Sequence, residues 1–216
     1  MNYAYAVFDN EKNTYSDWGL MLESVSIPLP DPQIVTLQIP GRNGALDLSE
    51  VLTGSVNYNN RVVSLRFSAL NSYDEWASLV SQVSSYLHGR LRKMVLDIDT
   101  GFYYYGRFSV DSSKSDEATS TIVITAVVDP YKYELDPVEF TKLIVTSEEV
   151  VLVGLRMPVV PVINSSAIMT VTFDEVVYNL AVGDNIIPDI NFIEGDNTLL
   201  FTGTGTIIIT YQRGTF

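Results

Sequence analysis

The clearest periodic pattern in the sequence lies between residues 72 and 88. Apolar side chains recur there at intervals of three and four, which places them on one face of a helix; they are Trp76, Leu79, Val80, Val83 and Leu87. Ser72 and Glu75 have the spacing of a capping box, in which each residue satisfies a free backbone N–H of the first turn. Gly89 follows directly, as a helix-ending glycine does. We therefore predict a helix that Trp76 anchors on a sheet and that Gly89 ends.

Strands with a two-residue period flank this helix on both sides. Before the helix, the apolar members of the alternation are Val63, Leu65 and Phe67. After it, they are Met94, Leu96 and Ile98. Asp99-Thr100-Gly101 then has the composition of a turn, and the aromatic residues 102–107 supply the second strand of a hairpin. The unit predicted is strand, helix and hairpin, with the helix lying across a mainly antiparallel sheet.

The segment before this unit reads as short strands around residues 3–8 and 20–25. Three prolines between residues 28 and 32 then force extended backbone that cannot donate to a central ladder. An apolar alternation over residues 35–39 leads into Asn43-Gly44, a dipeptide typical of tight hairpins. We predict a tight hairpin turn from Gly41 to Gly44, with Arg42 pointing away from the core.

After the hairpin, residues 111–118 are polar and predict a loop, whereas residues 119–129 are rich in β-branched residues and predict a strand. From residue 138 onward the helical period is absent, and short alternating segments are separated by turn signals. These signals are Asn164-Ser165, Asp174-Glu175, Gly183-Asp184, Gly195-Asp196-Asn197 and Gly203-Thr204-Gly205. The pattern predicts two mainly β domains, residues 1–137 with one helix in a sheet or sandwich, and residues 138–216 as a small β-sandwich.

Composition narrows the classes of function. The 216 residues are 46% hydrophobic and 18% charged, which is enough apolar material for a packed core and too little charge for a disordered chain. The formal net charge of −13 argues against direct binding of nucleic acid. The chain has no cysteine, no signal peptide pattern and no apolar run that could insert into a membrane. We expect a protein made in the cytosol.

Candidate catalytic and metal-binding motifs are incomplete. Asp99-Thr100-Gly101 matches the triplet of aspartic proteases, but catalysis needs a second carboxylate from a second such loop. Asp97 and Asp99 begin like a calcium loop that lacks its later ligands. The one histidine, His88, is already explained by the end of the helix, and zinc has too few ligands. We predict no enzymatic activity, no metal and no cofactor.

A carbohydrate- or receptor-binding module that acts through the C-terminal sandwich is the alternative from a different class. Sugar platforms expose aromatic faces, but residues 138–216 contain no tryptophan. Tyr178 and Tyr211 both stand in alternating segments where packing in the core is the expected role. The alternative therefore rests on the sandwich fold only.

Several short motifs, taken in order, resemble the distal tail protein family of long-tailed phages, especially those that infect Gram-positive bacteria. The resemblance covers about residues 17–133. It rests on Ile39-Pro40-Gly41-Arg42-Asn43-Gly44 with Leu46-Asp47-Leu48-Ser49, Tyr58-Asn59-Asn60-Arg61, the helix with Trp76, Leu87-His88-Gly89-Arg90, Asp97-Ile98-Asp99, Tyr104-Tyr105-Gly106-Arg107 and Asp129-Pro130-Tyr131. The C-terminal domain resembles that family's galectin-like sandwich by pattern rather than by motif.

The resemblance implies a structural protein of the virion. Members of the family form hexameric rings at the tip of the tail tube, where they join the tube protein to the tail-associated hub protein and often to receptor-binding proteins. The N-terminal domain builds the ring and the sandwich decorates its outside. In some relatives the sandwich carries an extended arm that holds receptor-binding proteins, and the short C-terminal domain here leaves little room for one.

The same motifs contain the residues that we nominate for assembly. The candidate interface consists of Arg42, Asn43, Arg61, Arg90 and Arg107. If the chain forms a ring, the polar loop with Asp111, Asp116 and Glu117 is a candidate to face its opening, because an acidic lining repels the DNA backbone as the genome passes. Trp76, Gly41, Gly44 and Gly89 are expected to serve the structure.

Overall fold

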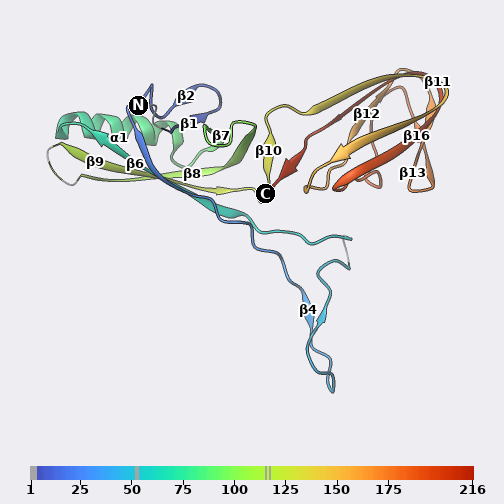
Figure 1. Ribbon diagram of the computed structural model, residues 1–216, viewed down its shortest axis with the longest axis horizontal. Helices are drawn as coiled ribbons and strands as arrows, with labels where there is room; N and C mark the ends of the chain where they lie inside the picture. Colours follow the sequence, from blue (N-terminus) through green and yellow to red (C-terminus); the bar gives the residue numbers. More distant parts are fainter. Residues whose placement is uncertain (1–3, 52–53, 115, 117) are drawn as a thin grey trace. The chain divides into compact units, whose positions relative to one another are not determined.

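The computed structural model describes residues 4–51, 54–114, 116 and 118–216 (Figure 1). The chain divides into two compact units, residues 1–132 together with Phe216, and residues 133–215. Within the described residues the fold is mainly β with a single helix, as the hydrophobic pattern predicts. No helix in the described part of the chain is long and apolar enough to cross a membrane.

The first unit is built on one antiparallel sheet with the strand order β2-β1-β7-β8-β9-β6-β3. A separate two-stranded sheet, β4-β5, lies in the connection between β3 and β6. The elements are β1 (Ala6–Phe8), β2 (Lys12–Asn13), β3 (Met21–Ser26), β4 (Thr36–Leu37), β5 (Leu46–Asp47), β6 (Arg61–Leu70), α1 (Tyr73–Leu87), β7 (Leu91–Leu96), β8 (Phe102–Lys114) and β9 (Thr119–Val128).

Strand β6 shows how directly the pattern sets the fold. Its residues alternate between buried and accessible positions along the whole strand, and Val63, Leu65 and Phe67 face the core as predicted. β6 pairs with β9 over ten consecutive residues, from Arg61–Val128 to Leu70–Thr119. The strand predicted from the β-branched residues 119–129 is therefore confirmed as β9, which pairs with β6.

Helix α1 begins and ends close to where the sequence places it. The capping box is present, because the Glu75 carboxylate accepts from the Ser72 backbone N–H at 2.8 Å and the Ser72 hydroxyl accepts from the Glu75 N–H at 3.4 Å. Gly89 follows the helix with φ +75°, as its role as a stop requires. The deepest contacts come from Val83 and Leu87, which are fully buried, whereas Trp76 is only half-buried.

The β7–β8 hairpin is confirmed, but β7 is shorter than predicted. Met94 and Leu96 are fully buried, whereas Ile98 is 62% exposed. The strand ends at Leu96 because the backbone turns at that point: Asp99 N–H donates to the Leu96 carbonyl at 3.0 Å, and Phe102 N–H donates to the Asp99 carbonyl at 3.2 Å. The alternation of apolar and polar residues continues to Ile98 in the turn, but there an apolar residue is no longer buried.

The polar loop predicted at residues 111–118 is also shorter. Strand β8 continues to Lys114, and Asp111 pairs with Val123 in β9. Residues 111–114 form a strand because the β-branched run of β9 offers them a complete ladder, although their own composition favours a loop.

The second unit contains two 17-residue strands, β11 and β16, that pair with each other over their full length. β13 and β12 also pair with β16, and β14 and β15 pair with β13 and β12, which gives the order β14-β13-β16-β12-β15. Its elements are β11 (Val138–Gly154), β12 (Val162–Ser165), β13 (Met169–Phe173), β14 (Val176–Leu180), β15 (Gly183–Ile186) and β16 (Gly195–Tyr211), with β10 (Lys132–Glu134) and β17 (Gly214–Thr215) at the boundary.

Four of the five turn signals predicted in this unit lie in strands. Gly183-Asp184 and Gly195-Asp196-Asn197 are the first residues of β15 and β16. Asn164-Ser165 ends β12 and Gly203-Thr204-Gly205 lies inside β16. The two glycines are there for close packing, since a Cβ on Gly203 would stand 2.6 Å from the Met169 Cβ. Asp174-Glu175, by contrast, is the turn between β13 and β14, and both residues have positive φ.

Candidate functional site

The connection between β3 and β6 forms an arm, which we define as residues 29–59. Its two strands are joined by backbone hydrogen bonds from Gln33 N–H to the Asn57 carbonyl and from Leu48 N–H to the Val35 carbonyl, each 2.8 Å, and by the β4–β5 pairs. Figure 1 shows it as a two-stranded hairpin that leaves the sheet of the first unit. Two strands alone cannot bury either of their faces. The apolar alternation predicts a strand here, and the strand forms, but its side chains remain accessible to solvent.

The described part of the arm exposes large apolar side chains along its whole length. Ile34 is 67% exposed and Val51 is 68% exposed, although single β-branched residues of this size are normally buried. The other exposed apolar residues of the arm are Leu29, Val35, Leu37 and Ile39. Six exposed large apolar side chains among the described residues of one extended segment make the arm a candidate interaction site.

The tip of the arm turns two residues earlier than predicted, over residues 39–42 instead of 41–44. Arg42 N–H donates to the Ile39 carbonyl at 3.1 Å, with Pro40 and Gly41 between them, and Gly41 has φ +82°. This is the sequence and geometry of a type II turn, which needs proline first and glycine second. The prediction of a tight turn from Gly41 to Gly44 is therefore wrong, although Gly44 also has positive φ. Arg42 and Asn43 are both exposed.

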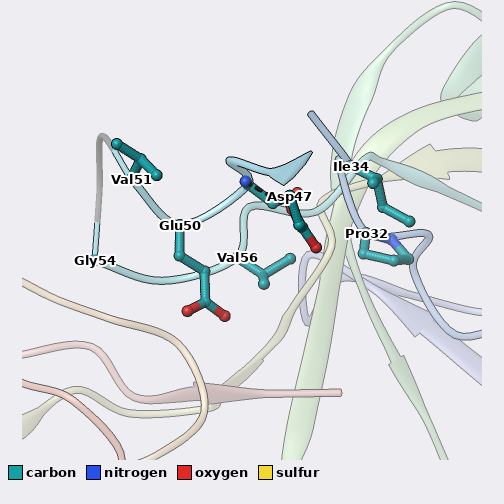
Figure 2. Close-up of a pocket in the computed structure, with 8 residues that line it drawn as sticks. Pro32, Ile34, Asp47, Glu50, Val51, Gly54 and Val56 are labelled. Carbon is teal, nitrogen blue, oxygen red and sulfur yellow. Dashed lines mark hydrogen bonds between the residues drawn. The ribbon is translucent and has the colours of Figure 1, made fainter. Parts of the chain in front are cut away.

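A cavity of about 690 Å³ lies along the arm (Figure 2). Its walls come from both strands of the arm and combine apolar side chains such as Ile34 with the carboxylates of Asp47 and Glu50. The Ser49 hydroxyl and N–H both donate to Asp47, which holds the pKa of that carboxyl below its usual range. The surface of the arm is therefore apolar with fixed negative charge.

Arg61 lies at the root of the arm and does not form an exposed interface as predicted. Its side chain is buried, because the first residue of β6 faces the core side of the sheet, and the residue is 4% exposed. Nη1 donates to the Pro28 carbonyl at 3.2 Å, and the guanidinium lies 5.6 Å from the centre of the Tyr104 ring. Burial lowers the pKa of Arg61, while Tyr104 and Asp99 act in the opposite direction.

Arg90 and Arg107 lie near the C-terminal end of α1. Arg107 Nη1 donates to the Gly89 carbonyl, and both of these residues line a cavity of about 490 Å³ together with Leu91 and Val127. Arg90 is exposed beside it. The structure therefore separates the five predicted interface residues into an arm tip (Arg42, Asn43), a buried arm root (Arg61) and a helix-end groove (Arg90, Arg107).

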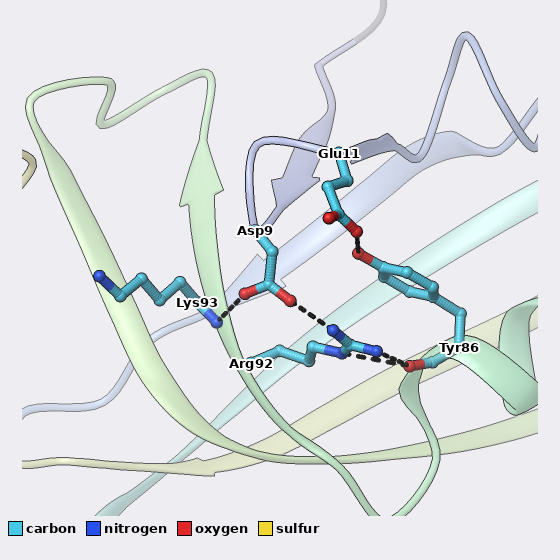
Figure 3. A network of polar contacts seen from close by, with 5 residues as sticks. All are labelled: Asp9, Glu11, Tyr86, Arg92 and Lys93. Carbon is cyan, nitrogen blue, oxygen red and sulfur yellow. Dashed lines mark hydrogen bonds and ion pairs between the residues drawn. The ribbon is translucent and has the colours of Figure 1, made fainter.

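Three basic residues follow the helix, Arg90, Arg92 and Lys93, and a polar network holds Arg92 in place (Figure 3). Arg92 donates to Asp9 at 2.7 Å and to the Tyr86 carbonyl at the end of α1, and its guanidinium stacks 4.3 Å from the Tyr86 ring centre. The Tyr86 hydroxyl donates to Glu11 at 3.1 Å. Burial, followed by this bond to Glu11, raises the pKa of Tyr86 to about 12. Arg92 thus joins the β1–β2 turn to the helix and is not available as a phosphate ligand.

The predicted acidic loop keeps part of its charge accessible. Asp111 is exposed on β8, and Asp116 is exposed in the loop. The Asp116 carboxylate accepts from the N–H groups of Ala118 and Thr119 at 2.8 and 2.7 Å, which lowers its pKa. Glu117 lies outside the described residues.

The remaining candidate motifs have structural partners. The Asp99 carboxylate accepts from the Tyr104 hydroxyl and from Lys132, each at 2.9 Å, and so has a structural role in the turn between β7 and β8. No group of three potential ligands that could hold a metal ion occurs among the described residues. Tyr211 is 4% exposed and Tyr178 packs against the core of the second unit, so neither presents a free aromatic platform.

The comparison with solved structures shows the fold of the chain. The SPP1 Dit (gp 19.1) protein, described as a paradigm of the hub adsorption apparatus in phages that infect Gram-positive bacteria, matches with a TM-score of 0.71 and 16% sequence identity, over 98% of this chain and 99% of that one. Two structures of the phage P2 baseplate, with calcium and with strontium, match at 8% identity with TM-scores of 0.46 and 0.45, over 97% or more of each chain. No protein-family model and no curated protein matches the sequence. The chain has the fold of the SPP1 Dit protein over nearly its whole length.

Proposed function

We propose that this chain is a structural protein of a phage tail that forms a hexameric ring at the distal end of the tail tube. The observation that carries the proposal is the similarity in fold to the SPP1 Dit protein over both units. The sequence motifs over residues 17–133 point to the same family. The protein is made in the host cytoplasm and acts in the virion.

The arm supplies a reason for assembly. The exposed apolar residues of the arm form one surface of the chain. The helix-end groove, which Leu91 and Val127 line, is a different surface of the same chain. When two different patches of the same protein bind head to tail, the contact repeats, and it gives a closed ring if the rotation closes. We assign the arm to the contact with a neighbouring copy, with Arg42 and Asn43 at its tip.

The two units divide the remaining roles. Residues 1–137 form the ring and contact the tail tube protein and the tail-associated hub protein. Residues 138–216 form a galectin-like sandwich on the outside, where a receptor-binding protein is a further partner. This division follows the resemblance stated above, and the fold match over both units supports it.

The molar mass of the purified protein tests the proposal. A hexamer has six times the 24.0 kDa mass of one chain, and light scattering coupled to size exclusion separates these masses clearly. We expect the hexamer at tens of micromolar protein in moderate salt. A single-chain mass under those conditions would overturn the ring.

The charge of the chain predicts how the ring treats DNA. With 26 acidic and 13 basic residues, and with Asp111 and Asp116 exposed, we expect no measurable binding of duplex DNA even near 20 mM salt, where the Debye length is about 20 Å. A gel shift checks this. The Asp111→Lys variant, which replaces an exposed negative charge by a positive one, is measured beside the unmodified protein. Micromolar binding by the unmodified protein would contradict the acidic opening and make Arg90 and Lys93 a functional patch.

A further inference from the structure

The guanidinium of Arg61 is only partly satisfied within the described chain. Nη1 donates to the Pro28 carbonyl, but Nε and Nη2 are buried and have no hydrogen-bond partner. An unpaired buried donor is costly, and more so when it carries a charge. The described residues around Arg61 therefore leave two of its nitrogens without a hydrogen-bond acceptor.

The two free nitrogens define the chemistry of that partner. Nε and Nη2 stand on the same edge of the planar guanidinium, where their N–H bonds run parallel and match the two oxygens of a carboxylate. The acidic residue whose charge acts on Arg61 is Asp99, and its carboxylate is already bound by Tyr104 and Lys132. The free edge of Arg61 thus fits a carboxylate from outside the first unit.

The site lies at the root of the arm. Pro28 precedes the arm and Arg61 follows it, so the Arg61–Pro28 hydrogen bond closes the loop at its base. Pro28 belongs to residues 27–31, which form no strand, and neither Pro28 nor Pro30 has an N–H to donate. The segment is tied to the other side of the arm at Asp31, whose carbonyl accepts from the Asn59 N–H at 2.8 Å, and at the Pro32–Tyr58 bridge. Movement of residues 27–30 leaves these contacts in place and gives a carboxylate access to the guanidinium.

We propose that the Nε and Nη2 edge of Arg61 binds a carboxylate of a neighbouring copy when the ring assembles. This inference rests on the proposed ring and assigns a partner to its contact. A second copy is the source because the arm, which we assign to that contact, begins and ends at this site and carries exposed carboxylates, Asp31, Asp47 and Glu50. Opposite charge therefore favours contact between the arm of one copy and the arm root of the next.

The test compares Arg61→Met with wild type below and above the concentration at which the protein assembles. Methionine removes the buried charge and fills much of the same volume. We expect the unassembled variant to melt no earlier than unassembled wild type, and its assembly to weaken by about tenfold or more. Arg61→Lys should not restore assembly, because an ammonium cannot bind both oxygens in this geometry.

A matched control is Arg66→Met on the same strand. Arg66 forms an exposed ion pair with Glu23 at 3.1 Å, so this substitution should not change assembly.

If wild type forms a ring and Arg61→Met assembles equally well, the inference is wrong and the ring stands. If the variant melts early when unassembled, Arg61 is satisfied inside its own chain and the inference is also wrong. If acetate or phosphate raises the melting temperature of unassembled wild type but not of Arg61→Met, a free anion is the ligand and the neighbouring copy is not. A wild type that never assembles removes the proposed function itself.

Discussion

Replacing Phe8 by alanine should lower the free energy of unfolding of the first unit by about 3–5 kcal/mol. Phe8 is fully buried, and its ring meets Phe108 edge to face at 5.2 Å and Trp18 at 6.3 Å. Truncation leaves a cavity between β1, β8 and the turn that follows β2, which the sheet cannot close. Calorimetry should show the transition of this unit lowered by roughly 10–20 °C.

The matched control lies in the second unit. Phe192 is also fully buried and meets Tyr211 edge to face at 5.1 Å. Phe192→Ala should lower the transition of residues 133–215 and leave that of the first unit in place, because the two hydrophobic cores share no residue. If both variants shifted one common transition by equal amounts, the two units would not be independent folding units.

The second large effect concerns the arm. Changing Val35, Leu37 and Ile39 to serine should weaken assembly about 100-fold, since these side chains are 56%, 51% and 38% exposed in the single chain and are buried against the neighbouring copy in the proposed ring. The melting temperature of the unassembled protein should change little. Sedimentation over a range of concentrations measures the shift.

The control for the arm uses apolar residues of similar exposure elsewhere. Leu143, Val151 and Val153 on β11 are 62%, 47% and 47% exposed, and the same change to serine there should leave assembly intact. Arg42→Ala at the tip should weaken assembly less than the triple change, with no loss of stability. If the arm variant assembled like wild type, the arm would have no role in the ring.

Much of the fold could be predicted from periodicity because burial in this chain follows it. The alternation of Val63, Leu65 and Phe67 gave β6, and the spacing that ends in Val83 and Leu87 gave α1 with its capping box. Local chemistry was sufficient in each case, because one element packs one face against one core.

The errors in the predicted turns and strand ends arise where the same residue types are compatible with more than one local structure. Asn43-Gly44 has the composition of a hairpin turn, but Pro40-Gly41, three residues earlier, forms a type II turn instead. Gly203 is a strand glycine because Met169 packs against its backbone, a long-range contact with no local signal. Ile98 continues an alternation after the strand has ended.

The candidate site was predictable only in part. The exposed tip of the arm with Arg42 and Asn43 follows from polar residues around a glycine turn. The burial of Arg61 does not, since an arginine at the start of a strand is normally accessible and its burial depends on Tyr104 and Pro28, which are distant in sequence. The sequence places the residue beside the arm, and only the three-dimensional structure shows its unpaired edge.

Electron microscopy of the purified protein tests the central claim most directly. At micromolar concentration we expect class averages of a closed ring with six equal subunits and a central opening, and we expect the arm variant with serine at Val35, Leu37 and Ile39 to give single particles of one chain. Wild-type particles of one chain, open filaments, or a ring with another number of subunits would contradict the account.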